Sequence, residues 1–403
     1  MNMLIIGNGF DLAHDRPTTY SDFLQFLNYI LLAKDYPGDK SQFEASLNIE
    51  CQMVKQYILA SFDARKYPGT EAAWSKNMMT QELYEHLDKN VWYEYFKKIW
   101  ENGLINGKNW IDFEQEILEV INFFDHKITN KYEPVSKLQG NSLNEKNQLF
   151  WSLFYVKMQQ ENVQRCTWSD FIDRTYQDLQ GLVRCLEIYL DDCVAKAHIT
   201  CCSPDIQELK IDSVLSFNYT SIPTDIYPSL TNTHYIHGRA KSDRPAAENN
   251  MVLGVNEYWD DYEKNFRTNF NCYKKFVQRI IKETKINYKR ALKFMLTEHK
   301  ERKQMYGRLN REAPNDNQVY IFGHSLDITD GDILREVIRT EGVTTTVYYK
   351  DKQQQANQIA NLSKVLGQDE LLKCVFSDSP TIIFKQQAAM LSCEMIGSAS
   401  KTF

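Results

Sequence analysis

The chain has 403 residues, 43% of them hydrophobic and 13% aromatic, with a formal net charge of −6. This length allows one large domain or two ordinary ones, and the bulk charge gives no reason to expect affinity for nucleic acid or membranes. No apolar run approaches the roughly 18 residues of a membrane span and no basic segment precedes the first apolar residues, so we expect a cytoplasmic protein without a signal peptide.

Residues 1–23 predict a strand, a tight glycine turn and the start of a helix. The apolar run 3–6 ends in Gly7, Asn8 and Gly9, and a helical pattern follows from Phe10. Glycine lets the backbone turn sharply and lets a phosphate approach its N–H groups. Leu12 stands where a G-x-G-x-x-G motif would have its third glycine, so a turn without a ligand stays an equal alternative.

Helices are expected over most of the region between about residues 40 and 205. Apolar residues recur there at steps of three and four, and the clearest stripe includes Leu179, Leu182, Val183 and Leu186. An earlier helix with Phe23 and Leu24 should be capped by Thr18 or Thr19.

Strand-like runs return after this region, at about 212–217, 233–237, 250–255, 318–323, 343–349 and 380–384. We therefore predict an α/β fold with a mainly parallel sheet and a large α-helical insertion after the first βα unit. The expected domains are a sheet domain of residues 1–35 and 206–403 and a helical insertion of residues 36–205. Nine cysteines without a C-x-x-C pair favour reduced thiols and no metal site.

Polar and glycine residues follow three of the later strands. Asn218 comes after the first, the pair His237 and Gly238 after the second, and Gly323-His324-Ser325 after the third of these. Open α/β sheets bind ligands at the carboxyl ends of their strands, so these residues and the first glycine turn should share one site.

A basic block interrupts the acidic average. Between Lys264 and Arg311 there are 15 Lys or Arg residues and three Glu residues, with apolar side chains at helical spacing. Such a block could bind nucleic-acid phosphates or a pyrophosphate, but a solvated helix face is the commoner meaning of a charge run.

The chain resembles the AbiH family of bacterial phage abortive-infection proteins in LIIGNGFDLAH, P-T-x-Y-x-x-F, W-x-D-F-E at 110–114, SFNYT, IHG and FGHSLDITD. The family is similar, more distantly, to sirtuin-like NAD-binding proteins, which have the same order of glycine turn, Asn segment, His-Gly pair and G-x-S segment. Three features differ: the sirtuin zinc module is absent, the opening turn has Asn8 and Phe10-Asp11 in place of small residues, and Thr220 stands where the sirtuin segment usually has Asp.

This resemblance implies a Rossmann-like, sirtuin-like sheet that binds NAD or a related nucleotide and hydrolyses its N-glycosidic bond in phage defence. Asn218 would hold a ribose hydroxyl or the attacking water, His237 would act as general base, and Asp11 or Glu114 would stabilise the positive transition state. The implied nucleotide-binding residues are Gly7, Asn8, Gly9, Phe10, Gly238, Gly323, His324 and Ser325, with backbone N–H groups of residues 7–10 facing the pyrophosphate.

Structural alternatives stay open for these side chains. Asn218 could cap a turn, His237 could be a core histidine, and Asp11 could only complement the start of its helix. His14 is expected on a helix surface. For Asp327 and Asp330 the alternative is that they cap the helix starting near Asp332 and have no further role.

Two other functions compete with hydrolysis. One is a nucleotide sensor without catalysis, and the other is a nucleic-acid-targeting effector that uses residues 264–311. The expected partners are a nucleotide ligand, a phage-derived trigger and a second copy of the chain in a homo-oligomer.

Overall fold

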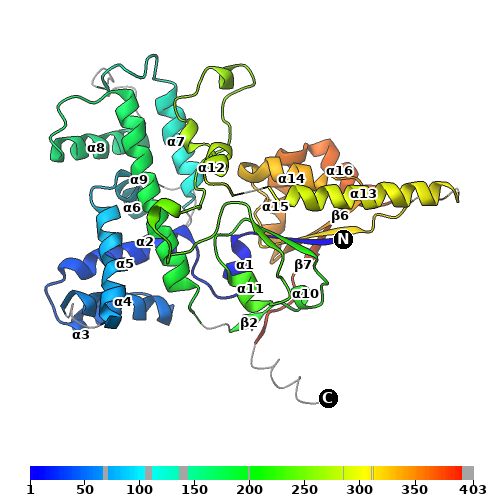
Figure 1. The fold of residues 1–403 in the computed structure, drawn as a ribbon, viewed down its shortest axis with the longest axis horizontal. Helices are drawn as coiled ribbons and strands as arrows, with labels where there is room; N and C mark the ends of the chain where they lie inside the picture. Colours follow the sequence, from blue (N-terminus) through cyan, green and yellow to red (C-terminus); the bar gives the residue numbers. More distant parts are fainter. Residues whose placement is uncertain are drawn as a thin grey trace. The chain divides into compact units, whose positions relative to one another are not determined.

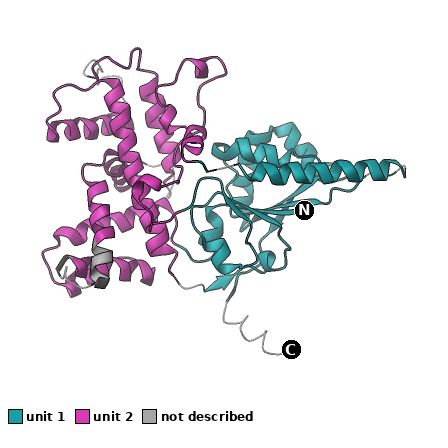
Figure 2. Ribbon diagram, viewed as in Figure 1, with its two compact units in different colours: residues 1–16, 198–239, 283–403 teal, residues 17–197, 240–282 magenta. Residues whose placement is uncertain are grey.

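A computed structural model describes residues 1–66, 71–104, 111–135, 144–197, 200–284, 286–309, 311 and 313–392. The chain divides into two compact units (Figures 1 and 2). Unit 1 contains residues 1–16, 198–239 and 283–403, and unit 2 contains residues 17–197 and 240–282. The chain therefore leaves the sheet unit twice, after residue 16 and after residue 239.

Unit 1 is built on a parallel six-stranded sheet in the order β4-β3-β1-β5-β6-β7. Its strands are β1 (Asn2–Ile6), β3 (Ser213–Ser216), β4 (Thr233–Tyr235), β5 (Asn317–Phe322), β6 (Val343–Tyr349) and β7 (Ile382–Gln386). The predicted parallel α/β sheet is confirmed. From β1 the chain adds strands first on one side and then on the other, so the strand order reverses between β1 and β5.

Helices of unit 1 cover the sheet, and both faces of its central strands are apolar. Met3, Ile5 and Val319 belong to one buried core with residues of the four helices from α13 to α16. The unit's helices are α1 (Asn8–Ala13), α10 (Pro204–Gln207), α11 (Ile222–Ile226), α13 (Tyr288–Gly307), α14 (Gly331–Ile338), α15 (Lys352–Leu366) and α16 (Gln368–Phe376). A short antiparallel pair, β2 (Cys201–Cys202) and β8 (Leu391–Ser392), was not expected from the sequence.

Unit 2 is helical, and aromatic rings fill its interior. Phe96 stacks on Phe113 with ring centroids 3.9 Å apart, and Tyr20 stacks on the same ring at 4.1 Å. The unit's helices are α2 (Tyr20–Asp35), α3 (Lys40–Ser46), α4 (Gln52–Lys66), α5 (Glu71–Leu87), α6 (Val91–Glu101), α7 (Phe113–Asp125), α8 (Glu145–Gln160), α9 (Trp168–Ile188) with the π-helix η3 (Tyr189–Val194), and α12 (Lys275–Ile281). Thr19 caps α2 in a capping box with Asp22, as one of the two predicted caps.

The unit boundaries differ from the domain boundaries expected from sequence. Helix α2 belongs to unit 2, where Phe26 contacts the rings of Tyr57 and Tyr189. Residues 240–282 also belong to unit 2, because buried Asp125 accepts hydrogen bonds from Tyr258 Oη and Trp259 Nε1, each at 2.8 Å.

The strand expected at 250–255 is wrong. Residues 251–255 are buried, but only Val255 pairs with another segment there, in a single bridge to Lys274. This stretch belongs to unit 2 and is not one of the strands of the parallel sheet. An apolar run between turn residues can be buried as an extended segment without joining a sheet, which its sequence cannot distinguish from a strand.

Candidate functional site

The predicted polar residues of unit 1 gather at the carboxyl edge of its sheet. Gly7 follows β1, Asn218 follows β3, His237 follows β4 and His324 follows β5. These four strands are consecutive neighbours in the sheet, in the order β4-β3-β1-β5. Parallel strands end at the same edge, so residues from four distant segments of the sequence are brought together there.

The turn after β1 packs directly on the turn after β5. Gly9 N–H donates to Gly323 O at 2.7 Å, and Gly7 N–H donates to Phe322 O at 3.3 Å. A Cβ on Gly9 would lie 2.8 Å from Gly323 O, and one on Gly7 would lie 2.8 Å from His324 Cα. The glycines of both turns are thus required by the close approach of two backbones, independently of any ligand.

This packing revises the expectation for the backbone N–H groups of residues 7–10. Those of Gly7 and Gly9 donate to carbonyls of residues 322 and 323, and that of Phe10 donates to Gly7 O at 2.8 Å. These three groups are engaged within the protein and do not face a pyrophosphate. Asn8 is the first residue of α1 and is half-buried.

Phe10 and His14 are core residues that fix helix α1. The Phe10 ring contacts those of His14, Tyr227 and Phe322. His14 Nδ1 lies 2.7 Å from Phe10 O and its Nε2 lies 2.9 Å from Tyr227 Oη. A neutral ring that donates from Nδ1 and accepts at Nε2 satisfies both contacts. Burial lowers the pKa of His14, and its predicted place on a helix surface is wrong, since it is 1% exposed.

Asp11, in the first turn of α1, is a buried carboxyl group with an altered proton affinity. It is 1% exposed, and Thr220 Oγ1 donates to its Oδ2 at 2.7 Å. Burial raises the pKa of Asp11 to about 7, although hydrogen bonds from Thr220 and Asn218 and the charge of Arg16 act in the opposite direction. Asp11 therefore changes charge near neutral pH. Thr220 is thus the hydrogen-bond partner of this carboxyl group.

Asn218 is held rigidly next to Asp11. Its Nδ2 donates to Gly7 O at 3.0 Å, and its backbone N–H donates to Ser216 Oγ at 3.1 Å. The side chain thus ties the end of β3 to the turn after β1, and it is 6% exposed. The amide has a structural task, and it also places a hydrogen-bonding group at the edge of the sheet beside a titratable carboxyl group.

His237 and His324 each face one oxygen of the same carboxylate, that of Asp330. His237 Nε2 is 3.0 Å from Asp330 Oδ1, and His324 Nε2 is 3.6 Å from Oδ2. Both histidines are 3% exposed. The Phe217 ring contacts both imidazoles, with centroid distances of 5.5 Å to His237 and 4.5 Å to His324.

Hydrogen bonds define which ring nitrogens carry protons in this cluster. His324 Nδ1 lies 2.9 Å from the backbone N–H of Leu326 and must accept from it, so the ring proton of neutral His324 is on Nε2, towards Asp330. The short contact of His237 Nε2 with the same carboxylate likewise favours a proton on that nitrogen. Asp330 therefore orients two imidazoles from different strand ends.

The alternative that Asp330 only caps a helix does not describe its side chain. It occupies the N-cap position of α14, but its side chain makes no capping hydrogen bond. Asp327 caps the preceding 3-10 turn η7 (Ile328–Asp330) and not α14, since its Oδ1 accepts from Thr329 N–H at 3.0 Å. The FGHSLDITD segment contains both acids, but nothing in their spacing shows which one turns towards the histidine after β4.

The other predicted residues take separate places. Gly238 turns the chain after β4 with φ +79°, and Ser325 is exposed, with its carbonyl accepting from Asn361 Nδ2 at 3.0 Å. Glu114 pairs with Lys275 in unit 2 at 2.7 Å, and Asp112 caps α7. Trp110 lies outside the described residues.

The described residues contain neither a metal-binding cluster nor a membrane-spanning helix. No group of three or more His, Cys, Asp or Glu residues among them could hold a metal ion. None of their helices has the length and apolar character needed to cross a bilayer.

Comparison with known proteins places the chain in a family. No curated protein and no solved structure matches it. The family model described as "Bacteriophage abortive infection AbiH" matches residues 3–349, which include the whole cluster at the carboxyl edge of the sheet. The chain therefore belongs to the AbiH family of bacteriophage abortive-infection proteins.

Proposed function

We propose that this AbiH protein defends against phage by hydrolysing the N-glycosidic bond of NAD or a related nucleotide. The observation that carries the proposal is the meeting of Asp11, Asn218 and the His237–Asp330 pair at the carboxyl edge of the sheet. General base, hydrogen-bonding amide and carboxylate are the groups that such a hydrolysis requires.

The strand order supports a nucleotide as the ligand. When the six strands of this sheet are numbered in chain order, β4-β3-β1-β5-β6-β7 becomes 3-2-1-4-5-6, which is the order of Rossmann-like dinucleotide-binding sheets. Such sheets bind the ligand where the order reverses, which here is between β1 and β5. Gly7, Gly9, Gly323 and His324 lie at that point. Asn8 and Ser325 are the residues of the two turns left to contact phosphate or adenosine.

His237 is the proposed general base. Asp330 accepts a hydrogen bond from the Nε2–H group of His237, so Nδ1 is the nitrogen that takes a proton in the reaction. The carboxylate stabilises the imidazolium that forms. In the reaction, the oxygen of a water attacks C1′ of the ribose while the bond from C1′ to the nicotinamide nitrogen breaks. Nicotinamide leaves with the electron pair of that bond, and His237 takes the proton of the water.

Asn218 and Asp11 act on the ribose in this proposal. The Asn218 amide orients a ribose hydroxyl or the attacking water. Asp11 stabilises the oxocarbenium character at C1′ when it is ionised, and a cationic ribosyl group beside it favours that ionised form. Because its pKa is about 7, hydrolysis should increase as the pH rises through neutrality.

The test is nicotinamide release from NAD by the purified full-length protein. Asn218→Ala and His237→Ala should abolish release, while His234→Ala, in the strand that precedes the base, should retain it. Folding of each variant is checked by circular dichroism and thermal unfolding. If the native protein binds NAD but forms no nicotinamide or ADP-ribose, alone or in phage-infected cells, the hydrolase is excluded in favour of a sensor.

A further inference from the structure

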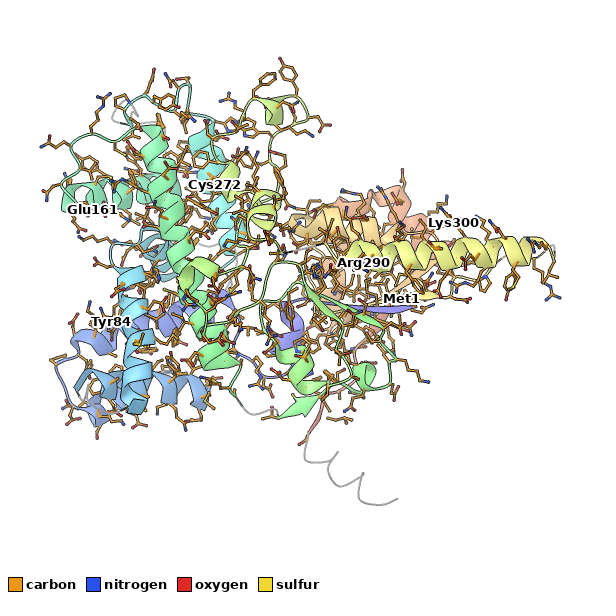
Figure 3. The ribbon with its side chains drawn as sticks, viewed as in Figure 1. Met1, Tyr84, Glu161, Cys272, Arg290 and Lys300 are labelled. Carbon is orange, nitrogen blue, oxygen red and sulfur yellow. The ribbon has the colours of Figure 1, made fainter. Side chains whose placement is uncertain are left out.

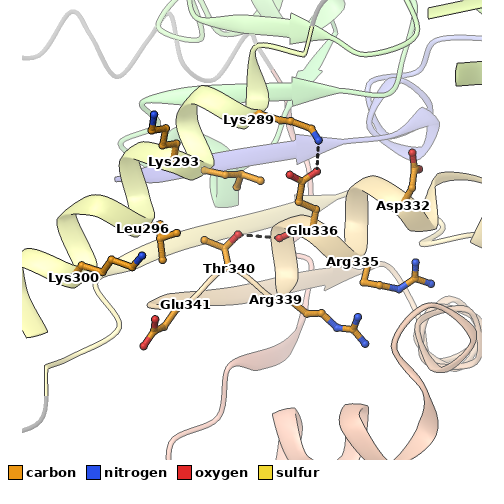
Figure 4. Close-up of a pocket in the computed structure, with 11 residues that line it drawn as sticks. Lys289, Lys293, Leu296, Lys300, Asp332, Arg335, Glu336, Arg339, Thr340 and Glu341 are labelled. Atoms are coloured by element: carbon orange, nitrogen blue, oxygen red, sulfur yellow. Dashed lines mark hydrogen bonds and ion pairs between the residues drawn. The ribbon is translucent and has the colours of Figure 1, made fainter.

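A groove lies between helices α13 and α14. It is a cavity of about 740 Å³ open at the surface, and every residue that lines it belongs to unit 1 (Figure 4). Helix α13 contributes Lys289, Lys293 and Lys300, and helix α14 contributes Arg335 and Arg339. In Figure 4 the lysines and the arginines come from the two opposite sides of the groove.

Two of the acidic residues in the groove are neutralised by neighbours. Glu336 accepts from Tyr288 Oη at 2.9 Å and lies 3.4 Å from Lys289. Glu341 lies 2.6 Å from Lys303, which lowers the pKa of Glu341. Asp332 is the third acidic residue of the lining, and Arg339 is itself paired with Glu370 at 2.5 Å. The lining thus has five cations and three carboxylates, an excess of positive charge in a chain whose net charge is −6.

Lys293 and Lys300 are two exposed lysines of the groove. Both are exposed, and within the described part of the chain neither makes an ion pair of 4 Å or less. Figure 3 labels Lys300, and also Arg290, on the same helix. Like charges along one side of a helix repel one another weakly, and an anion in the groove would relieve this repulsion.

The first half of the basic block has a different explanation. Lys274 pairs with Glu257 at 2.8 Å and Lys275 with Glu114 at 2.7 Å, and both lysines are buried in unit 2. Lys282 donates to Gln180 Oε1 at 2.7 Å, and burial lowers its pKa to about 8. These three lysines are engaged within unit 2.

We propose that the α13–α14 groove binds a nucleic-acid strand through its phosphates. Lys289 and Lys300 are eleven residues apart on one helix, which corresponds to roughly 16 Å along its axis. A nucleic-acid strand rises about 3.4 Å per nucleotide, so this row of cations matches about five nucleotides. It is too long for one pyrophosphate, and a concave groove with Arg335 on its far side suits a single strand, whose bases can stack on a guanidinium group.

The test is binding of fluorescein-labelled 12-nucleotide single strands, one RNA and one DNA, measured by fluorescence anisotropy on the full-length protein. Four phosphate contacts predict a slope of log K against log salt of roughly −3, or about fifty-fold weaker binding at 200 mM than at 50 mM salt. Lys293→Glu with Lys300→Glu should weaken binding more than tenfold at 50 mM salt and flatten the slope by about 1.5.

The matched control is Lys127→Glu with Lys131→Glu, which makes the same charge change at two exposed lysines of unit 2. The control should bind like the native protein, and nicotinamide release should be the same in both double variants. Equal loss in the two double variants, an unchanged affinity of the groove variant, or no binding of either strand at 50 mM salt would overturn the proposal. Complete competition by micromolar pyrophosphate would replace it with a small-anion site.

Discussion

The carboxylate of Asp330 lies 3.0 Å from Nε2 of His237, although 93 residues separate the two in sequence. The contact joins the end of β4 to the start of α14. A carboxylate in this position fixes the ring orientation and the tautomer of a histidine and stabilises its protonated form. In the proposed hydrolysis Asp330 is therefore a positioning residue that acts through His237.

Asp330→Asn should lower kcat for nicotinamide release about tenfold to a hundredfold with little change in KM, because the imidazolium loses its charged partner. Asparagine keeps the size of the side chain, so the fold should survive. Histidine ¹⁵N spectra give a second readout, in which the His237 tautomer should change even where no turnover is observed. Kinetics and spectra together separate positioning from a merely structural role.

The control for this variant is Asp327→Asn in the same turn. Asp327 accepts from Thr329 N–H and makes no contact with either histidine that would orient it. Its kcat and its histidine spectra should match those of the native protein. Native-like kcat and an unchanged His237 tautomer in Asp330→Asn would show that the carboxylate only packs.

Asp11→Asn should stabilise the protein increasingly as the pH rises from 4 to 8. The folded-state pKa of Asp11 is about 7 and its ordinary value is 3.8, so the folded chain holds this proton where the unfolded chain has released it. The contribution to stability is full below about pH 4 and is lost as the pH rises to 7. The difference between variant and native free energies of unfolding should grow by up to roughly 4 kcal/mol.

Urea unfolding at pH 4, 6 and 8 measures this difference. Asp15→Asn is the matched control, because Asp15 is exposed and asparagine tolerates its positive φ of 56°. The control difference should change with pH by less than that of Asp11→Asn. A constant difference for Asp11→Asn as well would mean that Asp11 ionises normally.

The sheet could be predicted from sequence because its strands have a strong signature. Central strands covered on both faces are continuous apolar runs such as residues 3–6 and 319–322, separated by helical patterns. The second excursion of the chain, residues 240–282, could not be predicted in the same way. It is attached to unit 2 by single buried contacts, such as those of Asp125 and Glu114, which leave no periodic pattern.

The candidate site was only partly predictable. Strand ends indicated Asn218, His237 and His324, because parallel strands bring their carboxyl ends together. The partner of His237 was missed, since an acid just before a helix reads as a cap whether or not its side chain turns elsewhere. The glycines were correctly expected in tight turns, but the neighbour that requires them is another turn of the protein, 314 or more residues away in sequence.

His14 should make the protein less stable in acid. Burial lowers its folded-state pKa, so below its ordinary pKa of about 6.5 the unfolded chain binds a proton that the folded chain resists. Stability contributed by this group is present above that pH and is lost as the pH falls. His14→Gln should be less stable at pH 7.5, but its free energy of unfolding should decrease less between pH 7.5 and 5.5 than that of the native protein. His126→Gln, at an exposed histidine, should keep the native pH dependence.

Gly323→Ala tests how far the contact between the two turns stabilises the sheet. Gly323 has φ +67°, and a Cβ there would overlap the backbone of Gly9 and Phe10. Gly367→Ala is the matched control, because Gly367 has φ +93° but nothing within 4 Å of an added Cβ. The control should lose only the conformational cost of about 1–3 kcal/mol.

Gly323→Ala should lose at least 2 kcal/mol more than this control in urea unfolding, since backbone atoms cannot move aside as a flexible side chain would. It should also abolish nicotinamide release, because separating the two turns displaces Gly7, whose carbonyl holds Asn218. Equal losses in the two alanine variants would show that backbone conformation alone, and not the close approach of the turns, requires glycine at position 323.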